Sequence, residues 1–312
     1  MIIEYLQPDP SLADGLTVVV RAIYYTATLG AVGMVAFLAL MGGRLRPEED
    51  AWTRRAILIA VLAGLAASTL SMGLRAVVLS TEGLAGLVRF DLYPVILASR
   101  IGDSLMLRVA GLVLMLAVLS RGSWGLPLAA AGAVLVVMSY TAMGHSTLYR
   151  PRQELAALVG VHLAMVAFWA GSLLPLRYVI ASGSREHAAR VVAEWSRVAI
   201  PAVAILVTAG ATAAWYLVGR WHLLVTSWYG WRLMAKLVAF AVLLGFAIAH
   251  RAWLSRALAA GRPGAQRRLS RTIGLEIVVA FAVFYAAADV SGFARSSCAA
   301  SDGPRDGLRG TH

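Results

Sequence analysis

Cysteine is scarce in this chain of 312 residues, and so are charged residues of either sign, lysine among them. Cys298 is the only cysteine, which excludes an intramolecular disulfide, a CxxC redox pair and a cluster of thiolate metal ligands. Only 14% of the residues are charged and 60% are hydrophobic, and the mean hydropathy is +0.74. A soluble domain carries about a quarter charged residues. The composition therefore excludes an ordinary water-soluble fold and indicates an integral membrane protein.

Motifs for nucleotide binding and hydrolysis are also absent. The sequence contains no P-loop, no GxGxxG between a strand and a helix, no HExxH and no GxSxG. Without a nucleotide-binding motif the chain is not itself an ATP-driven pump, and we expect it not to be an enzyme. The net charge of +12 comes from basic residues between the apolar runs, a pattern that indicates membrane topology and no nucleic-acid partner.

Eight apolar runs are long enough to cross a bilayer, which takes roughly 20 residues per helix. They predict an all-α fold, a polytopic transmembrane helical bundle of about eight helices surrounded by membrane lipid. The segment 80–100 mixes apolar and charged residues around Pro94, and we interpret it as re-entrant or interfacial rather than as a ninth crossing. The predicted spans are 16–41, 56–79, 101–119, 124–143, 155–176, 198–218, 233–250 and 272–289.

The distribution of arginine and lysine predicts the orientation. Connections on one side of the predicted bundle hold fifteen basic residues, and the opposite connections and termini hold nine. The positive-inside rule then places both termini outside the cytoplasm. The N-terminus is acidic and lacks the features of a cleaved signal peptide, so we expect the first helix to be retained. Residues 1–293 form one predicted transmembrane domain, and the polar segment 294–312 is expected to be disordered.

A weak internal repeat appears when the third span is aligned with the seventh. Gly102 then matches Gly230, and Arg108 matches Lys236. Halves 16–143 and 155–290 would be two parallel four-helix repeats, related by an axis along the membrane normal. Chance similarity between helices rich in Leu, Ala and Val is the alternative.

Polar and small residues inside the spans have ordinary structural interpretations. We expect the basic side chains of Arg75, Arg108 and Lys236 to snorkel to the outer interface. Asp289 ends the last span and either binds a cation or pairs with Lys236 or Arg108. Small residues are expected to let helices approach closely, and they are Gly30, Gly33, Gly171 and Gly210.

Two histidines fall at similar depths in neighbouring spans. His145 closes the fourth span, and His162 lies about two turns into the fifth. Such a pair could hold a metal ion, a haem or nothing. His162, Met165 and Trp169 recur at helical spacing and are expected to share one face of the fifth span.

Methionine favours the metal interpretation, since thioether sulfur is a soft ligand suited to Cu(I). The alternative is that these side chains only fill gaps between helices. The methionines in the outer halves of the predicted spans are Met72, Met106, Met138, Met143, Met165 and Met234.

The stretch VGVHLAMVAFWAGSLLPL is similar to the pattern H-L-x(5)-W-x-G-x-L-x-P-L of the bacterial copper resistance protein D (CopD/PcoD) family. The chain resembles that family over residues 155–290, and more loosely in its first half. The resemblance implies an inner-membrane protein that receives copper on the periplasmic side, from a separate carrier of the CopC type, and passes it inward. His145 and His162 are the positions carried over from the family. The last span lacks the threonine and proline expected near its outer end.

Three functions are consistent with these features. The first is copper transport through an outer site of Met143, His145, His162 and Met165, with Asp289 as a further candidate ligand. The second is a membrane b-type cytochrome in which His145 and His162 ligate haem. The third is an assembly or scaffold protein without a ligand of its own.

Overall fold

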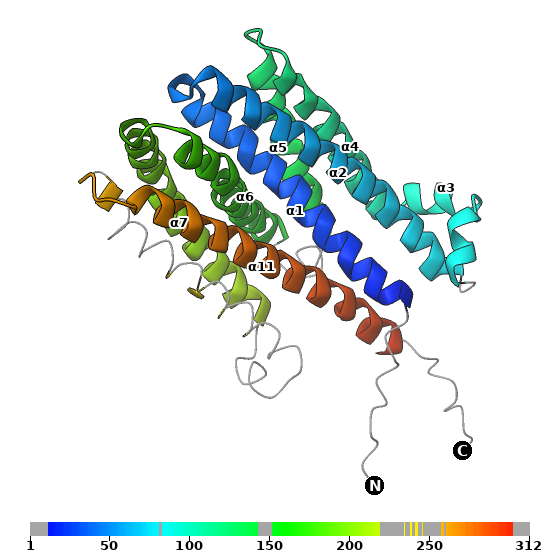
Figure 1. Ribbon diagram of the computed structural model, residues 1–312. Helices are drawn as coiled ribbons and strands as arrows, with labels where there is room; N and C mark the ends of the chain where they lie inside the picture. Colours follow the sequence, from blue (N-terminus) through cyan, green and yellow to red (C-terminus); the bar gives the residue numbers. More distant parts are fainter. Residues whose placement is uncertain are drawn as a thin grey trace, which may run out of the picture.

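The fold is a bundle of long antiparallel helices (Figure 1). The computed structural model of the chain describes residues 12–80, 83–142, 152–218 and 260–301, and the single positions 234, 238, 241, 242, 245, 257 and 258. Its elements are α1 (Leu12–Met41), η1 (Gly42–Arg44), α2 (Pro47–Ser80), η2 (Gly83–Val88), α3 (Leu92–Leu97), α4 (Arg100–Met115), η3 (Leu116–Leu119), α5 (Gly125–Thr141), α6 (Arg152–Ser182), α7 (Arg185–Val218) and α11 (Ala265–Ser301).

The predicted helical membrane bundle is confirmed. Within the described residues, six helices are long and apolar enough to cross a membrane, and α5 is a shorter apolar helix of 17 residues. Seven of the eight predicted spans coincide with these helices. The remaining one, 233–250, falls largely outside the described residues. Helix α11 continues to Ser301, so residues 294–301 of the predicted tail 294–312 are helical.

Helices α7 and α11 begin at the same end of the bundle. Arg185, the first residue of α7, donates a hydrogen bond to the carbonyl of Gly261 just before α11, at 3.2 Å. Gln266 in α11 donates to the carbonyls of Ile180 and Gly183 at the end of α6. The chain therefore leaves α7 at one end of the bundle and enters α11 at the other. Figure 1 shows α1 beginning where α11 ends. We call that end the outer end, after the predicted orientation.

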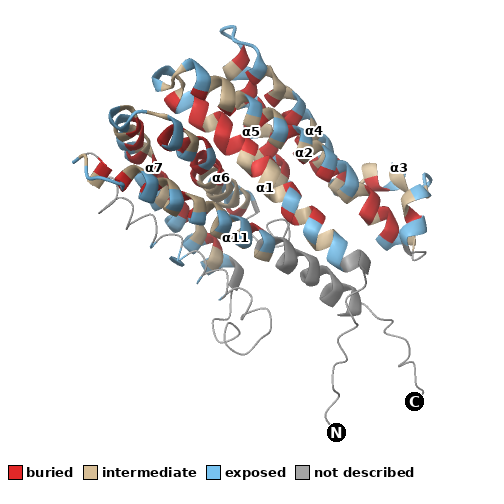
Figure 2. Cartoon of the chain, in the orientation of Figure 1, coloured by how far each residue is buried: buried red, intermediate tan, exposed pale blue. Residues whose placement is uncertain are grey.

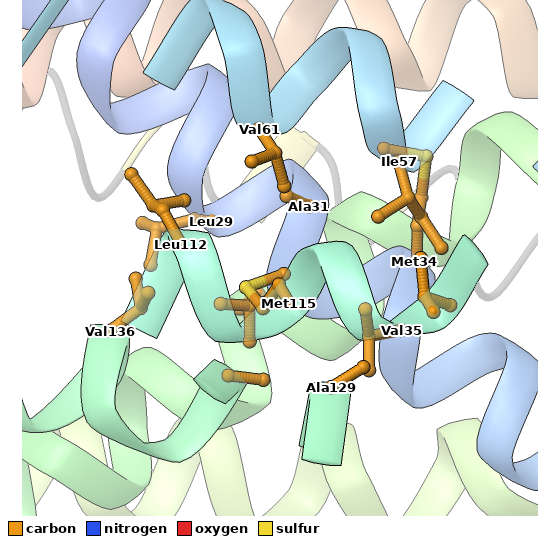
Figure 3. Packing of buried hydrophobic residues seen from close by; sticks show 14 of the residues in the cluster. Leu29, Ala31, Met34, Val35, Ile57, Val61, Leu112, Met115, Ala129 and Val136 are labelled. Atoms are coloured by element: carbon orange, nitrogen blue, oxygen red, sulfur yellow. The ribbon is translucent and has the colours of Figure 1, made fainter. Parts of the chain in front are cut away.

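Helix α1 occupies the centre and packs against α2, α5, α6 and α11. Figure 2 shows buried residues concentrated along α1 and on the facing sides of its neighbours. Figure 3 shows part of this core, where Met34 of α1 lies beside Ile57 of α2 and Met115 of α4 belongs to the same cluster. Large apolar side chains such as Ile59 and Trp215 lie instead on the periphery, as expected where lipid is the solvent.

Glycines bring two helix pairs into backbone contact. A Cβ added to Gly33 of α1 would lie 1.8 Å from the carbonyl oxygen of Ala167 and 2.7 Å from the Cα of Gly171, both in α6. Gly111 of α4 and Gly132 of α5 face each other in the same way, with an added Cβ meeting the opposite carbonyl oxygen at 2.6 and 2.5 Å. The prediction of close approach is confirmed at Gly33 and Gly171.

The segment between α2 and α4 forms two short helices, η2 and α3, at the outer end of α2. Each has six residues, too few to cross a membrane, so the prediction that it is not a ninth crossing is confirmed. Between them, hydrogen bonds from Arg89 hold the pKa of the Asp91 carboxyl below its usual range. The apolar side chains of Val88, Phe90 and Val95 stay exposed.

Substitution of Gly33 tests the contact between α1 and α6. Gly33→Ala is expected to destabilise the protein, because the methyl group meets backbone that cannot rotate away, and overpacking of this kind costs about 1–3 kcal/mol. The measurement is Tm of the purified protein in detergent.

Gly30→Ala is the matched control on the same helix. Nothing lies within 4 Å of a Cβ added there, and alanine is favoured over glycine in a helix by about 1 kcal/mol. A Tm for Gly33→Ala at or above that of Gly30→Ala would contradict the packing.

Candidate metal-binding site

His162 lies at the interface between α6 and α7. Its Nδ1 is 3.2 Å from the carbonyl oxygen of Leu206 in α7. A carbonyl oxygen only accepts, so Nδ1 carries the proton and donates it, which leaves Nε2 with its lone pair. Metal-binding histidines commonly donate their second nitrogen to a backbone carbonyl in this way. The imidazole is therefore held in the tautomer that leaves Nε2 able to bind a metal.

Gly210 makes room for this imidazole. A Cβ added to Gly210 would lie 2.9 Å from both Nδ1 and Cε1 of His162, and 4.0 Å from Nε2. The Nδ1 edge of the ring thus fills the space left by the missing side chain, with Nε2 farther from α7. We predicted that Gly210 lets helices approach closely, and the structure shows that its neighbour is the histidine.

Met165 and Trp169 lie on the same side of α6 as His162. Trp169 packs with Leu206 of α7, and Met165 packs against that cluster and against the neighbouring cluster of Phe168, Ala199 and Ala202. The prediction that His162, Met165 and Trp169 share one helical face is confirmed. Residues from α6 and α7 thus place one imidazole and one thioether along the same interface.

Three other predicted ligands remain predictions. Met143 and His145 lie outside the described residues, and Asp289 falls in the helical backbone of α11 without a described side chain. Among the residues that the structure describes, no three His, Cys, Asp or Glu side chains gather into a metal site. Completion of a copper site by His145 and Met143 belongs to the proposal below.

The outer methionines do not all line one site. Met106 of α4 and Met138 of α5 are 54% and 51% exposed on the periphery of the bundle. Met234 is exposed as well. Their exposure argues against a role in one buried site, so fewer of the outer methionines are candidate ligands than the sequence alone suggested.

The expectation that Arg108 snorkels is wrong. Its side chain is buried, with 6% exposed, between α1, α4 and α5. The guanidinium carbon lies 4.4 Å from the ring centre of Tyr24 and 4.7 Å from that of Tyr140. Its Nε donates to Ser139 Oγ and its Nη2 to Ser104 Oγ, each at 3.1 Å. Hydroxyls and aromatic faces thus replace the water that snorkelling would have reached.

A second polar cluster lies at the opposite end, around Glu49. This fully buried carboxylate at the start of α2 accepts hydrogen bonds from the backbone N–H and the guanidinium of Arg46. His187 of α7 donates from Nε2 to the same carboxylate at 2.9 Å. His187 is thereby tied to the inner end, so the part of the chain described here offers no second histidine to His162 for a bis-histidine haem.

Gly210→Ala is expected to displace the imidazole of His162, because the added methyl group would occupy its position. The measurement is the ¹⁵N NMR spectrum of histidine-labelled protein, with the His162 signals assigned through His162→Gln. Wild type should show the Nδ1–H tautomer, and Gly210→Ala should lose it. An unchanged His162 spectrum in Gly210→Ala, matching that of Gly30→Ala, would argue against the contact.

Two family models match the chain. "Copper resistance protein D-like, N-terminal domain" matches residues 12–150, and "Copper resistance protein D" matches residues 189–289. The two matches cover α1 to α5 and most of α7 and α11, and α6 with His162 lies between them. Searches of curated proteins and of solved structures gave no match. With both parts of the family matched in order along one chain, this protein belongs to the copper resistance protein D family.

Proposed function

We propose that this protein transports copper across the membrane and that His162 is a copper ligand on the route. Family membership supports a role in copper resistance or transport. The observation that carries the site is the bond from His162 Nδ1 to the carbonyl of Leu206, which leaves Nε2 available to a metal. Copper is the substrate here rather than a resident cofactor.

The ligand set proposed around His162 is His145, Met143 and Met165. Imidazole and thioether are both suited to copper, and thioether favours Cu(I). Asp289, on the outer part of α11, is a further candidate for contact with the cation. Neutral and soft ligands would release the ion as well as capture it, which conduction requires.

The proposed direction is inward from the outer end. The distribution of arginine supports a multi-pass protein of the inner membrane with both termini in the periplasm. Copper would arrive from a separate periplasmic carrier of the CopC type. His162 and Met165 are the described half of the proposed ligand set. They lie ten and thirteen residues after Arg152, the first residue of α6.

Copper accumulation by cells expressing the protein tests the proposal. The double variant His145→Ala, His162→Ala is expected to lower the copper uptake that depends on the protein by about tenfold or more, the scale on which altered ligand shells change metal affinity. Uptake is measured as cellular copper by mass spectrometry, at equal amounts of protein in the membrane. Uptake equal to that of wild type would refute the proposal.

Two methionines of the outer half provide a matched comparison. Met165→Leu, in the interface of α6 and α7, is expected to reduce uptake several-fold, whereas Met138→Leu, on the periphery, should leave it unchanged. Equal effects of the two substitutions would show that Met165 is not a ligand.

A Soret band in the absorption spectrum of the purified protein would instead favour the cytochrome.

A further inference from the structure

Arg108 places a positive charge inside the membrane-spanning bundle. It lies eight residues into α4, roughly 12 Å from the start of that helix at 1.5 Å per residue. Arginine stays protonated in proteins. Charged side chains within spans ordinarily pair with an opposite charge or mark a functional site, because the low dielectric makes an isolated charge costly.

The groups around the guanidinium are neutral. Ser104 gives its hydroxyl proton to the carbonyl of Ser139, and Ser139 gives its own to the carbonyl of Val136. Both hydroxyls therefore offer only lone pairs to Arg108. The remaining contacts are the aromatic faces of Tyr24 and Tyr140. The dipoles of the serine hydroxyls and the quadrupoles of the tyrosine rings solvate the guanidinium without cancelling its charge.

The tyrosines are fixed in place. Thr28 donates its hydroxyl proton to the carbonyl of Tyr24 at 2.7 Å, so in its 2.6 Å contact with Tyr140 the threonine oxygen accepts and the tyrosine donates. The rings of Tyr24 and Tyr140 are 5.6 Å apart. The cluster thus holds the guanidinium in one position between α1, α4 and α5.

No aspartate or glutamate in the described part of the chain forms an ion pair with Arg108. The guanidinium carries five N–H donors, and the described residues accept from Nε and from Nη2, leaving Nη1 for another acceptor. The positive charge of Arg108 and the N–H donors of its Nη1 are therefore both available to a negatively charged partner.

We propose that Arg108 binds one small monovalent anion of the halide class at its Nη1 edge. The anion is monovalent because one guanidinium supplies the charge of the cluster. We take it to be small because Ser104, Ser139 and Tyr24, which surround the guanidinium, are themselves buried. The anion site does not depend on what the protein transports, since none of the residues that surround it, Arg108, Ser104, Ser139, Tyr24 and Tyr140, is a proposed copper ligand.

Thermal unfolding of the full-length protein in detergent tests the site. Wild type is titrated with sodium bromide or sodium chloride, and with sodium gluconate at the same ionic strength as the large-anion control. A bound halide should give a saturable rise in Tm of a few degrees that gluconate does not give. Equal shifts in halide and gluconate would overturn the proposal.

Variants connect the shift to the guanidinium. Arg108→Gln should abolish the halide shift, Arg108→Lys should keep a weaker one, and Arg55→Gln, which changes an exposed arginine of α2, should match wild type. A full halide shift in Arg108→Gln would refute the site. If Arg108→Gln does not fold, bromide located by anomalous scattering in wild-type crystals decides, with no peak at Nη1 refuting the site.

Asp289 is the internal alternative to a bound halide. Its side chain lies outside the described residues, and a carboxylate from α11 would compete for the same guanidinium. A halide shift that appears in Asp289→Asn but not in wild type would show that the counter-charge is internal and would overturn the proposal. Equal shifts in the two proteins support a bound anion.

Discussion

The close contact of α1 with α6 at Gly33 and Gly171 is the packing constraint on which the bundle depends. Lipid supplies no hydrophobic force between helices, so association relies on close packing and on hydrogen bonds between helices. Here two glycines bring backbone against backbone at the centre of the protein. Helix α1 then presents its remaining sides to α2, α5 and α11, and α6 is fixed with one side against α1 and another against α7.

That second side of α6 carries His162, and the same principle serves a different purpose there. Gly210 leaves a space that an imidazole fills, and the helical carbonyl of Leu206 orients the ring. On the other side of α1, Arg108 lies among Tyr24, Tyr140 and two serines. The bundle thus separates a group suited to bind a cation, between α6 and α7, from a buried positive charge between α1, α4 and α5.

The sequence predicted the helices well because a span in lipid needs a continuous apolar run, and seven of the eight runs coincide with described helices. It predicted the start of α2 too late. Pro47 and the acidic residues of the first turn extend that helix into the polar region, where hydropathy gives no signal but the helix dipole favours negative charge.

The shared face of His162, Met165 and Trp169 followed from helical spacing. The environment of Arg108 did not, because Tyr24 and Tyr140 are far from it along the chain and only tertiary packing brings them together. The exposed positions of Met106 and Met138 were missed for the same reason. Position along the sequence predicts the depth of a side chain in the membrane, but tertiary packing decides which way the side chain points.

Copper binding at His162 is the central claim, and the affinity of the purified protein for Cu(I) tests it most directly. A competition titration against a Cu(I) chelator of known affinity would compare wild type with His162→Gln, which retains a polar side chain but lacks the Nε2 lone pair. We expect wild type to retain Cu(I) against the chelator and His162→Gln to bind at least about tenfold more weakly. Equal affinities of the two proteins for Cu(I) would contradict the assignment of His162 as a ligand.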